Sequence, residues 1–503
     1  MTRTHVSKYI EQNIARFQQI YTDCADIKMR RMKLGRNRKR TCFLAYIEVS
    51  VESVSLEQNA IGKLMSYLNE LPEDAFTDAL NENAMGLSDM QPFDTVEEAA
   101  TAMLTGDAIF FVDGYERALK IPDRGYPGMS VSESDSEKVI RGSRESFTDS
   151  IKINSALIRK RVRATNVKVS EQILGQRSQT CVDLVYIEDL VRPELLDEIQ
   201  KRLGSYEIDG ILDGGVIEQL SEENWYSPFP QFLTTQRPDR AAMSILEGRV
   251  VVLTDNSPTA LILPTDYNSF LKTTDDYYNR FEAASFARLL RYAASFLAMS
   301  LPGFYIAITN FHTQLLPTPL LISFWQARMG VPFPAAFEVI LMELAFELLR
   351  EAGVRLPGPM GNTIGIVGGL IVGQAAVEAN LVSPIVVIVV AFTALCSFAI
   401  PNEEFAFAFR ILKFLLILLC AWMGFFGFLV GLTLVLIHLS KLKSFGFLYL
   451  TPFAGADLNN YEDTKDALLR FPLRRLQKRP IYAQSRQRTK LFFKKNAAPG
   501  SRQ

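Results

Sequence analysis

The stretch from Leu289 to His438 limits what this chain of 503 residues can fold into more than any other feature. Its composition is that of a protein embedded in a lipid bilayer. The clearest segment runs from Ile411 to His438 and has ionisable groups only near its ends. A helix rises about 1.5 Å per residue, so this segment is long enough to cross a hydrocarbon core about 30 Å thick. We predict one transmembrane helix here.

Two further segments are apolar enough to cross a bilayer. Leu381 to Ile400 carries no charge, and Pro384 lies in its first turn, where a missing N–H does little harm. Leu289 to Asn310 contains Pro302-Gly303, so we expect a kink in that helix. The sequence therefore predicts at least three spans.

A fourth apolar segment, Ala335 to Ala352, carries carboxylates that a plain membrane anchor would not have. They recur every fourth residue and therefore form one stripe along a helix. A charge at mid-bilayer costs about 2.5–3.5 kcal/mol, so the stripe is expected to face protein or water rather than lipid. Either arginines pair with the stripe at the membrane interface, or the stripe lines an aqueous vestibule for cations. The stripe consists of Glu343, Glu347 and Glu351, and the candidate arginines are Arg350, Arg355 and Arg328.

A fifth segment, residues 361–378, is rich in glycine. Its glycines recur every fourth residue and give a face that lets another backbone approach closely. Plain helix packing is one explanation, and an apolar constriction that gates a pore at an oligomer axis is another. The glycines are Gly361, Gly365, Gly369 and Gly373, and the candidate constriction residues are Ile364, Val367 and Ile371.

The two ends of the chain constrain its topology. The residues after His438 are strongly basic, which predicts a cytoplasmic tail that lies against anionic lipid rather than nucleic acid. The first residues contain no apolar signal-peptide core, so the N-terminal portion is expected on the same side. Both ends on one side require an even number of crossings. We therefore expect one of the five segments, either 335–352 or 361–378, to be re-entrant or interfacial.

The residues before the membrane stretch have an α/β pattern that occurs twice. The hairpin pattern from Leu104 to Pro122 aligns without a gap on the one from Leu246 to Pro264, with Asp113 and Asp255 in equivalent turns. Hairpins reuse turn chemistry, so chance similarity is the alternative explanation. We predict two related α/β subdomains.

The predicted architecture is an α/β soluble region of two related subdomains followed by an all-α multi-span transmembrane domain. The expected divisions are a basic lead-in (1–40), the first subdomain with a linker (41–140), the second subdomain (141–270), a polytopic membrane domain (271–440) and a basic cytoplasmic tail (441–503).

No arrangement of residues in the sequence points to catalysis. The five cysteines have no C-x-x-C spacing and the three histidines are scattered, so neither a metal cluster nor a hydrolase triad can be assigned. Walker A and G-x-G-x-x-G motifs are also missing from the sequence. We therefore predict no enzyme activity, no cofactor and no metal site.

Several motifs in combination resemble the A subunits of GerA-type spore germinant receptors. In the soluble part they are RGSRESFTDSIKINSALIRKRV from Arg141, YIEDL from Tyr186, and the stretch from Ser227 to Pro264. In the membrane part they include LLPTPLLISFWQARMGVPFP, GIVGGLIVGQAAVEANLVSP, SFAIPNEE and KSFGFLYLTPF. The similarity covers about residues 140–475, and Ser143 departs from it where the usual motif has a proline.

This resemblance implies a protein of the spore inner membrane that works with a permease-like B subunit and a lipoprotein C subunit. In that family the nutrient is thought to bind the B subunit, while A subunits assemble into an ion-conducting ring. We therefore expect a nutrient-gated complex whose membrane domain forms a homo-oligomeric cation channel that starts germination. The alternatives are a SpoVAF-type accessory channel and a secondary transporter. A repeat occurs in the soluble half only, which disfavours the transporter.

Overall fold

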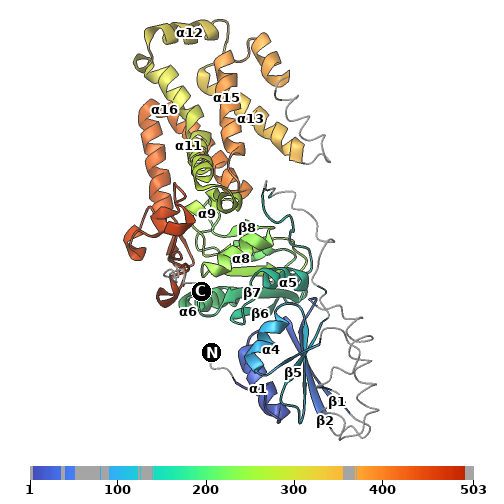
Figure 1. Ribbon diagram of the computed structural model, residues 1–503. Coiled ribbons are helices and arrows are strands. Elements are labelled where there is room, and N and C mark those ends of the chain that lie inside the picture. The colour runs from blue at the N-terminus through green and yellow to red at the C-terminus, as the bar shows by residue number, and fades with distance from the viewer. Residues whose placement is uncertain are drawn as a thin grey trace, which may run out of the picture.

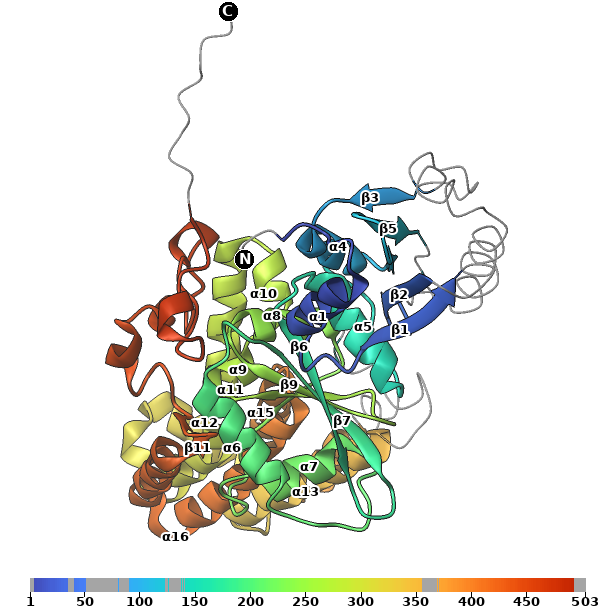
Figure 2. The same cartoon turned by 90° about the horizontal axis from the view of Figure 1, so that it is seen from below.

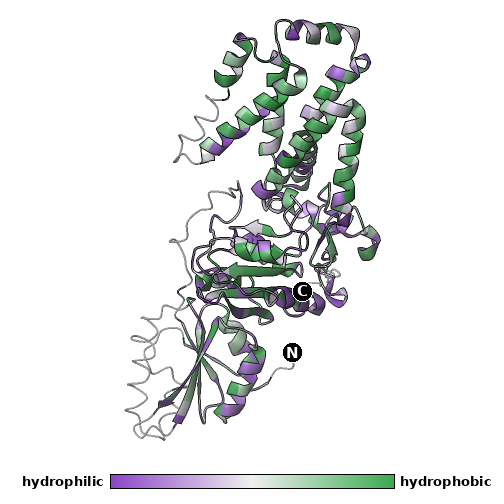
Figure 3. Cartoon of the chain, turned by 180° about the vertical axis from the view of Figure 1, so that it is seen from behind, coloured by the Kyte–Doolittle hydropathy of each residue, from purple (hydrophilic) through white to green (hydrophobic). Residues whose placement is uncertain are grey.

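The computed structural model describes residues 4–34, 40–50, 80, 90–122, 125, 137, 139, 141–354, 369 and 371–492. Two α/β units come first, a helical region follows, and a C-terminal segment folds back onto the second unit (Figure 1). Hydrophobic residues predominate in the helical region, whereas hydrophobic and hydrophilic residues are mixed in both units (Figure 3). The chain is therefore α/β in its N-terminal part and helical in its C-terminal part.

The first unit is built on an antiparallel five-stranded sheet with the order β1-β2-β4-β5-β3. Helices α1 and α4 pack together on this unit (Figure 2) and contribute to one apolar core with the sheet. The elements are α1 (Ile10–Ile20), β1 (Ile27–Leu34), β2 (Arg40–Ile47), β3 (Gln91–Phe93), α4 (Val96–Met103), β4 (Ala108–Val112) and β5 (Ala118–Ile121).

The sequence predicts a basic lead-in over residues 1–40, but α1 and β1 within this range are elements of the first unit. Apolar residues recur along α1 at helical spacing, and Ile10, Ile14 and Phe17 are buried in the core of the first unit. All of β1 pairs with β2. The four basic residues of β1 concealed this pattern, because a short segment rich in Lys and Arg is also typical of a solvated loop, and edge strands often carry such charges.

The second unit repeats the sheet of the first, with the order β6-β7-β9-β10-β8. Helices α5 and α8 share one apolar core with this sheet, and α6 and α7 share another. The elements are α5 (Ile151–Arg161), β6 (Val167–Leu174), β7 (Thr180–Ile187), α6 (Pro193–Leu203), α7 (Gly214–Ser221), β8 (Leu233–Thr235), α8 (Pro238–Leu246), β9 (Val250–Thr254) and β10 (Ala260–Leu263).

The two units also match in register and in helix capping. Ile27 pairs with Ile47 at one end of β1–β2, as Val167 pairs with Ile187 in β6–β7. Asp113 accepts a hydrogen bond of 3.2 Å from the first backbone N–H of α1, and Asp255 accepts one of the same length from that of α5. Strand order and register are thus those that the predicted relation between the units requires.

A buried contact joins the units. Arg159 of α5 donates from Nη2 to Oδ1 of Asp26 at 2.9 Å, and both side chains are buried. Beside this pair, the backbone N–H of Ala25 donates to Val169 of β6 at 3.0 Å, and Lys168 donates to the carbonyl of Thr22 at 2.8 Å. The first unit is therefore attached along the edge strand β6.

The helical region begins with two short helices and continues with longer ones. In the part of the chain that the structure describes, α11 and α16 are long and apolar enough to cross a membrane, and α15 is apolar but shorter. Helix α11 continues through Pro302. The elements are α9 (Tyr267–Leu271), α10 (Asp275–Tyr278), α11 (Phe281–Phe311), α12 (Thr318–Arg328), α13 (Ala335–Val354), α15 (Pro384–Phe398) and α16 (Glu403–Lys441).

Helix α16 reverses its direction at Gly424, which has φ 59° and ψ −136°, a conformation that suits glycine. Phe409 and His438 both pack against the ring of Phe229, with centroids 5.6 and 6.2 Å away. In a straight helix these two residues would lie about 40 Å apart. The element is therefore a helical hairpin with a first leg (403–423) and a second leg (425–441).

Glycines allow the two legs to lie against each other. A Cβ at Gly427 would overlap the carbonyl of Leu419, and one at Gly431 would overlap the side chain of Leu416. A Cβ at Gly424 would lie 2.7 Å from the ring of Phe311, at the far end of α11. The prediction of one transmembrane helix over residues 411–438 is therefore wrong, because that apolar run contains the turn of a hairpin.

The C-terminal segment is ordered and packs on the second unit. It contains β11 (Lys443–Ser444), β12 (Phe447–Leu448) and short 3₁₀ turns. Tyr449 donates to the carbonyl of Pro230 at 2.9 Å, and the N–H of Gln484 donates to Leu190 at 2.8 Å. Residues 443–492 therefore pack on the second unit, and the predicted contact of this basic segment with anionic lipid stays a prediction.

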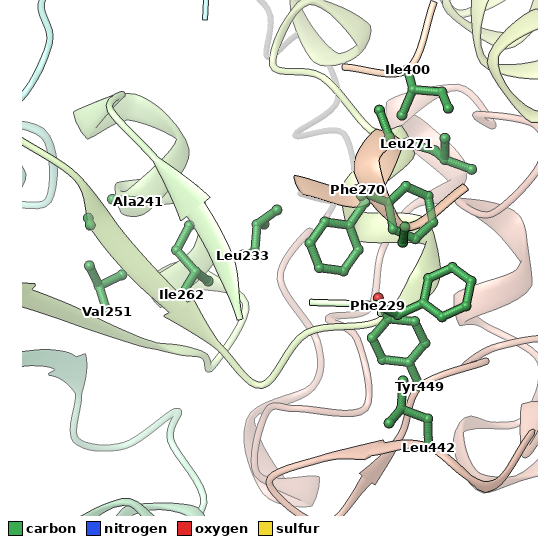
Figure 4. Close-up of a cluster of buried hydrophobic side chains, with 14 of the residues drawn as sticks. Phe229, Leu233, Ala241, Val251, Ile262, Phe270, Leu271, Ile400, Leu442 and Tyr449 are labelled. Carbon is green, nitrogen blue, oxygen red and sulfur yellow. The ribbon is translucent and has the colours of Figure 1, made fainter. Parts of the chain in front are cut away.

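One continuous apolar cluster joins the second sheet to the base of the helical region. Figure 4 shows Val251 and Ile262 of the sheet, Phe270 of α9 and Tyr449 of the C-terminal segment in this cluster, with Ile400 just before α16. The rings of Phe270 and Phe405 stack with centroids 4.9 Å apart. The second unit and the first leg of α16 therefore share one apolar core.

Candidate functional site

A cluster of charged side chains lies inside the helical region, between α13 and the first leg of α16. Glu343 of α13 and Lys413 of α16 are buried, and Glu343 Oε2 lies 2.5 Å from Lys413 Nζ. Glu347, one turn further along α13, lies 3.2 Å from Arg410 and 3.4 Å from Lys413. Two carboxylates of the predicted stripe thus meet two cations of a helix about 70 residues further along the chain.

This cluster lies near the middle of the helical layer. Lys413 is close to the midpoint of the first leg, about 15 Å from either end at 1.5 Å per residue. Taking charges out of water costs several kcal/mol per ion, and good pairing geometry offsets part of that. In a membrane such residues are rare and usually functional. The Glu343–Lys413 pair is therefore the strongest candidate site in the described part of the chain.

The arginines that the sequence suggested as partners of the stripe have other contacts. Arg350 donates to Ser397 Oγ at 2.5 Å and lies over the ring of Phe398, 4.5 Å from its centroid. Arg328 lies 3.3 Å from Glu338, whose other oxygen accepts from the N–H of Ser383 at 2.8 Å. Arg355 lies outside the described residues. Glu343 and Glu347 form their ion pairs with Lys413 and Arg410 instead.

The remaining predicted site residues are divided between described and undescribed positions. Glu351 is exposed near the end of α13, and Ile371 is exposed on the helical residues 371–378. A Cβ at Gly369 would meet open space, whereas one at Gly373 would lie 3.2 Å from Val387 of α15. Gly361, Ile364, Gly365 and Val367 lie outside the described residues.

A second buried charge cluster lies where α11 meets the C-terminal segment. Asp466 accepts from Arg288 at 2.8 Å and from the hydroxyl of Tyr277 at 2.6 Å, and it lies 3.2 Å from Lys272. Burial alone would raise the pKa of Asp466, but Lys272 and Arg288 hold it well below its usual range. Asp276 also lies 3.2 Å from Arg288. The ion pairs fix the base of α11 to the C-terminal segment.

Carboxylates also gather where the second unit meets the first leg of α16. Burial, with Glu404 and Glu222 nearby, raises the pKa of Glu218 on α7 to about 9. Burial also raises the pKa of Glu222 to about 7. Both groups therefore carry protons over part of the neutral range, which limits the repulsion at this junction.

Sequence reasoning found the acidic stripe but missed its partners. Lys413 stands in the run ILKFLLILL, and a charge inside an apolar segment is itself a signal of a functional or paired residue. The sequence places this lysine at the end of a predicted span that begins at Ile411. Because the hairpin begins at Glu403, the same lysine lies in the middle of a leg.

A comparison with protein families identifies the chain. The family model described as "Bacillus/Clostridium GerA spore germination protein" matches residues 15–482. The chain belongs to the GerA family. GerA-family relatives include spore germination protein GerLA of Bacillus cereus, 38% identical over 427 residues, which cover 85% of this chain and 86% of that protein. Spore germination protein KA of Bacillus subtilis is 35% identical over 475 residues, which cover 94% and 87% of the two chains.

The chain is also similar to a membrane protein of Bacillus subtilis and to one solved structure of a germinant receptor domain. The uncharacterized membrane protein YfkQ of Bacillus subtilis is 37% identical over 476 residues, which cover 94% of this chain and 91% of YfkQ. Among solved structures, the N-terminal domain of the A subunit of the Bacillus megaterium spore germinant receptor GerK3 matches with 26% identity and a TM-score of 0.42. That match covers 52% of this chain and 98% of the solved chain.

Proposed function

We propose that this chain is the A subunit of a spore germinant receptor and acts with a permease-like B subunit and a lipoprotein C subunit. In this proposal its helical region spans the inner membrane of the spore several times and oligomerises into a path for cations. Membership of the GerA family supports the receptor role, since relatives over most of the chain are named spore germination proteins.

The path of the chain supports a multi-span arrangement with both soluble ends on one side. Helix α11 leaves the second unit, and its far end lies beside the turn of the α16 hairpin. The second leg of that hairpin returns to the second unit, where His438 lies 2.8 Å from the hydroxyl of Ser227. In this proposal the two legs on either side of Gly424 cross separately, where the sequence predicted one crossing, so the five apolar segments no longer require an odd number.

The observation that carries the proposed cation path is the buried pair of Glu343 and Lys413. We infer that in the resting state Lys413 and Arg410 neutralise the stripe on α13 and thereby keep cations from it. The first leg of α16 packs on the second unit through Phe405 and Phe409. A shift of this leg would withdraw Lys413 and leave Glu343 and Glu347 facing the path, where carboxylates attract cations.

The experiment measures potassium release from spores that carry substitutions at matched protein levels. Glu343→Gln removes the acceptor and is expected to lower release after addition of germinant. Lys413→Gln removes the cation that holds the stripe and is expected to cause release before germinant is added. Lys413→Arg is the matched control, because it keeps the charge and is expected to behave much more like the parent protein.

Two results would contradict this function. Parental release in both Glu343→Gln and Lys413→Gln spores, before and after germinant, would exclude the pair from the path. Loss of the receptor from the membrane in Lys413→Gln but not in Lys413→Arg would indicate a structural role for the charge.

For the glycine-rich segment, Val367→Ala is expected to widen the proposed constriction and to increase the leak of potassium in the same assay.

A further inference from the structure

All three tryptophans of this chain are exposed. Trp225 and Trp325 are each 71% exposed and Trp422 is 78% exposed. Large aromatic side chains are usually well buried in folded domains, whereas tryptophans of membrane proteins gather at the two membrane–water interfaces. Because all three tryptophans are exposed, we infer that they contact a lipid or another protein outside this chain.

Two of the tryptophans lie at the end of the helical region that is far from the α/β units. Trp422 comes two residues before the turn at Gly424. Trp325 is on α12, which has no buried residue and lies across this end of the helical region (Figure 1). At 1.5 Å per residue, Trp422 is about 28 Å from the start of the first leg, close to the thickness of a hydrocarbon core. Both therefore lie at the level of the far interface.

The third tryptophan belongs to the second unit and lies near the opposite end of the helical region. Trp225 stacks on Tyr226, which is equally exposed, with ring centroids 3.7 Å apart. The next residue, Ser227, lies 2.8 Å from His438 near the end of the second leg. Because a chain extends at most about 3.6 Å per residue, Trp225 lies within about 7 Å of Ser227 along the backbone.

The surface beside this loop changes from apolar to cationic within a few residues. Leu434, Leu436 and Ile437 are exposed on the second leg, as expected of a surface in contact with acyl chains. Lys441 and Lys443, which follow, are exposed as well. Lysines at this position usually reach the head groups of lipids. The loop of Trp225 and Tyr226 therefore lies at the level where acyl chains give way to head groups.

We propose that Trp225 and Tyr226 insert into the head-group layer of the adjacent leaflet and anchor the second unit on the membrane surface. This inference rests on the proposed placement of the helical region in a bilayer. A stacked Trp–Tyr pair suits such a site, since both rings are largely apolar and carry one polar group. The anchor sets the distance between the second unit and the membrane and so restrains the first leg of α16.

The test uses the full chain in vesicles and the quenching of tryptophan fluorescence by brominated lipids. One variant keeps only Trp225, with Trp325→Phe and Trp422→Phe. A second variant keeps only Trp422. The matched control changes all three tryptophans to Phe and carries Tyr9→Trp, since Tyr9 is 70% exposed on the first unit. The lipids carry bromine either close to the head group or near the end of the acyl chain.

Trp225 is expected to lose much of its emission with bromine near the head group and less with bromine deep in the chain. The Tyr9→Trp control is expected to keep its emission with both lipids. Quenching of Trp422 without quenching of Trp225 would overturn the anchor and leave the bilayer placement intact. If bromine does not quench Trp225, and addition of the B subunit shields Trp225 from solvent, Trp225 and Tyr226 would be assigned to a contact with protein instead. Quenching of neither would contradict the bilayer placement as well.

Discussion

The two α/β units have the same sheet, but their cores differ at one equivalent position. In the first unit, Phe17, Phe43 and Phe111 form a cluster with ring centroids 5.7–6.0 Å apart. The strand registers place Asp183 of β7 where β2 has Phe43, and Leu253 where β4 has Phe111. One unit therefore fills its centre with aromatic rings, and the other places a carboxyl group there.

Burial of the Asp183 carboxyl group in the core of the second unit is energetically unfavourable. Asp183 is 1% exposed, and neither of its oxygens has a hydrogen-bond partner among the described residues. Burial raises its pKa to about 7, although Lys152 nearby lowers it, and Glu171 raises it further. The carboxyl group is thus largely protonated in weak acid and charged above neutral pH.

Two units with the same sheet topology thus fill equivalent core positions with chemically different residues. Among the described residues of the first unit, α1 and α4 cover one face of the sheet, and Leu44, Phe110 and Leu119 are buried on its other face. The second unit accepts a polar residue because it is also held from outside, by Arg159 at the first unit and by the cluster that joins it to the helical region. We expect the second unit to be the more adjustable of the two, which suits a unit that packs directly on α16.

The largest loss of stability is expected when Phe43 of the first unit is replaced by aspartate, the residue at the equivalent position of the second unit. Phe43→Asp removes a buried ring and introduces a carboxyl group, and we expect a loss of about 5 kcal/mol or more in the first unit. Hydrogen exchange measured by mass spectrometry on the full chain would show faster exchange in peptides of β2. Phe43→Leu, with a loss below about 1.5 kcal/mol, is the control. Equal exchange in both variants would refute the importance of the aromatic cluster.

A similar loss is expected at the contact between the units. Arg159→Met leaves Asp26 buried without its cation, which typically costs about 3–5 kcal/mol. Exchange should rise in β1 and β6 together, because these segments meet at the contact. Replacement of both partners, Asp26→Leu with Arg159→Met, is expected to recover much of the loss. A rise confined to β6 would show that the first unit does not depend on this pair.

The reverse substitution, an apolar residue in place of Asp183, is expected to stabilise the second unit. The unfolded carboxyl of Asp183 ionises at about pH 4, and the folded one at about pH 7. The unfolded chain therefore releases its proton first as pH rises, and stability falls between about pH 4 and pH 7 and stays low above that. Asp183→Leu removes this loss, which is at most about 4 kcal/mol at pH 8.

The pH dependence distinguishes this gain from a general effect of added apolar surface. Exchange in β7 of Asp183→Leu should slow markedly at pH 8 and considerably less at pH 5, after correction for the intrinsic rate. Asp197→Leu is the control, because Asp197 lies on the outer part of α6 and its replacement should change neither value much. A gain of the same size at both pH values would show that ionisation of Asp183 is not the cause.

The smallest effects are expected to be equal in the two units. Asn13 and Asn154 each exchange two hydrogen bonds with the backbone before a helix, at Ser7 and Thr148. Asn13→Ala and Asn154→Ala should each cost about 1–2 kcal/mol. The measurement is exchange at the first turns of α1 and α5. A clear difference between the two would show that the equivalence of the units does not extend to their energetics.

Features that depend on local chemistry could be predicted from the residues alone. The turns at Asp113 and Asp255 predict the hairpins β4–β5 and β9–β10, and the ungapped alignment predicts their relation. The spacing of four residues places Glu343 and Glu347 on one face of α13 wherever that helix lies. These features follow from neighbouring residues, so no knowledge of the rest of the chain is needed.

Features that depend on contacts between distant residues could not be predicted in this way. An apolar run of 28 residues satisfies the hydrophobic effect as one long helix or as two legs, because burial of apolar area has no direction. The choice rests on Gly424, Gly427 and Gly431 lying against Phe311, Leu419 and Leu416. The pairing of Glu343 with Lys413 likewise joins residues 70 positions apart, and only the packed helices bring these charges together.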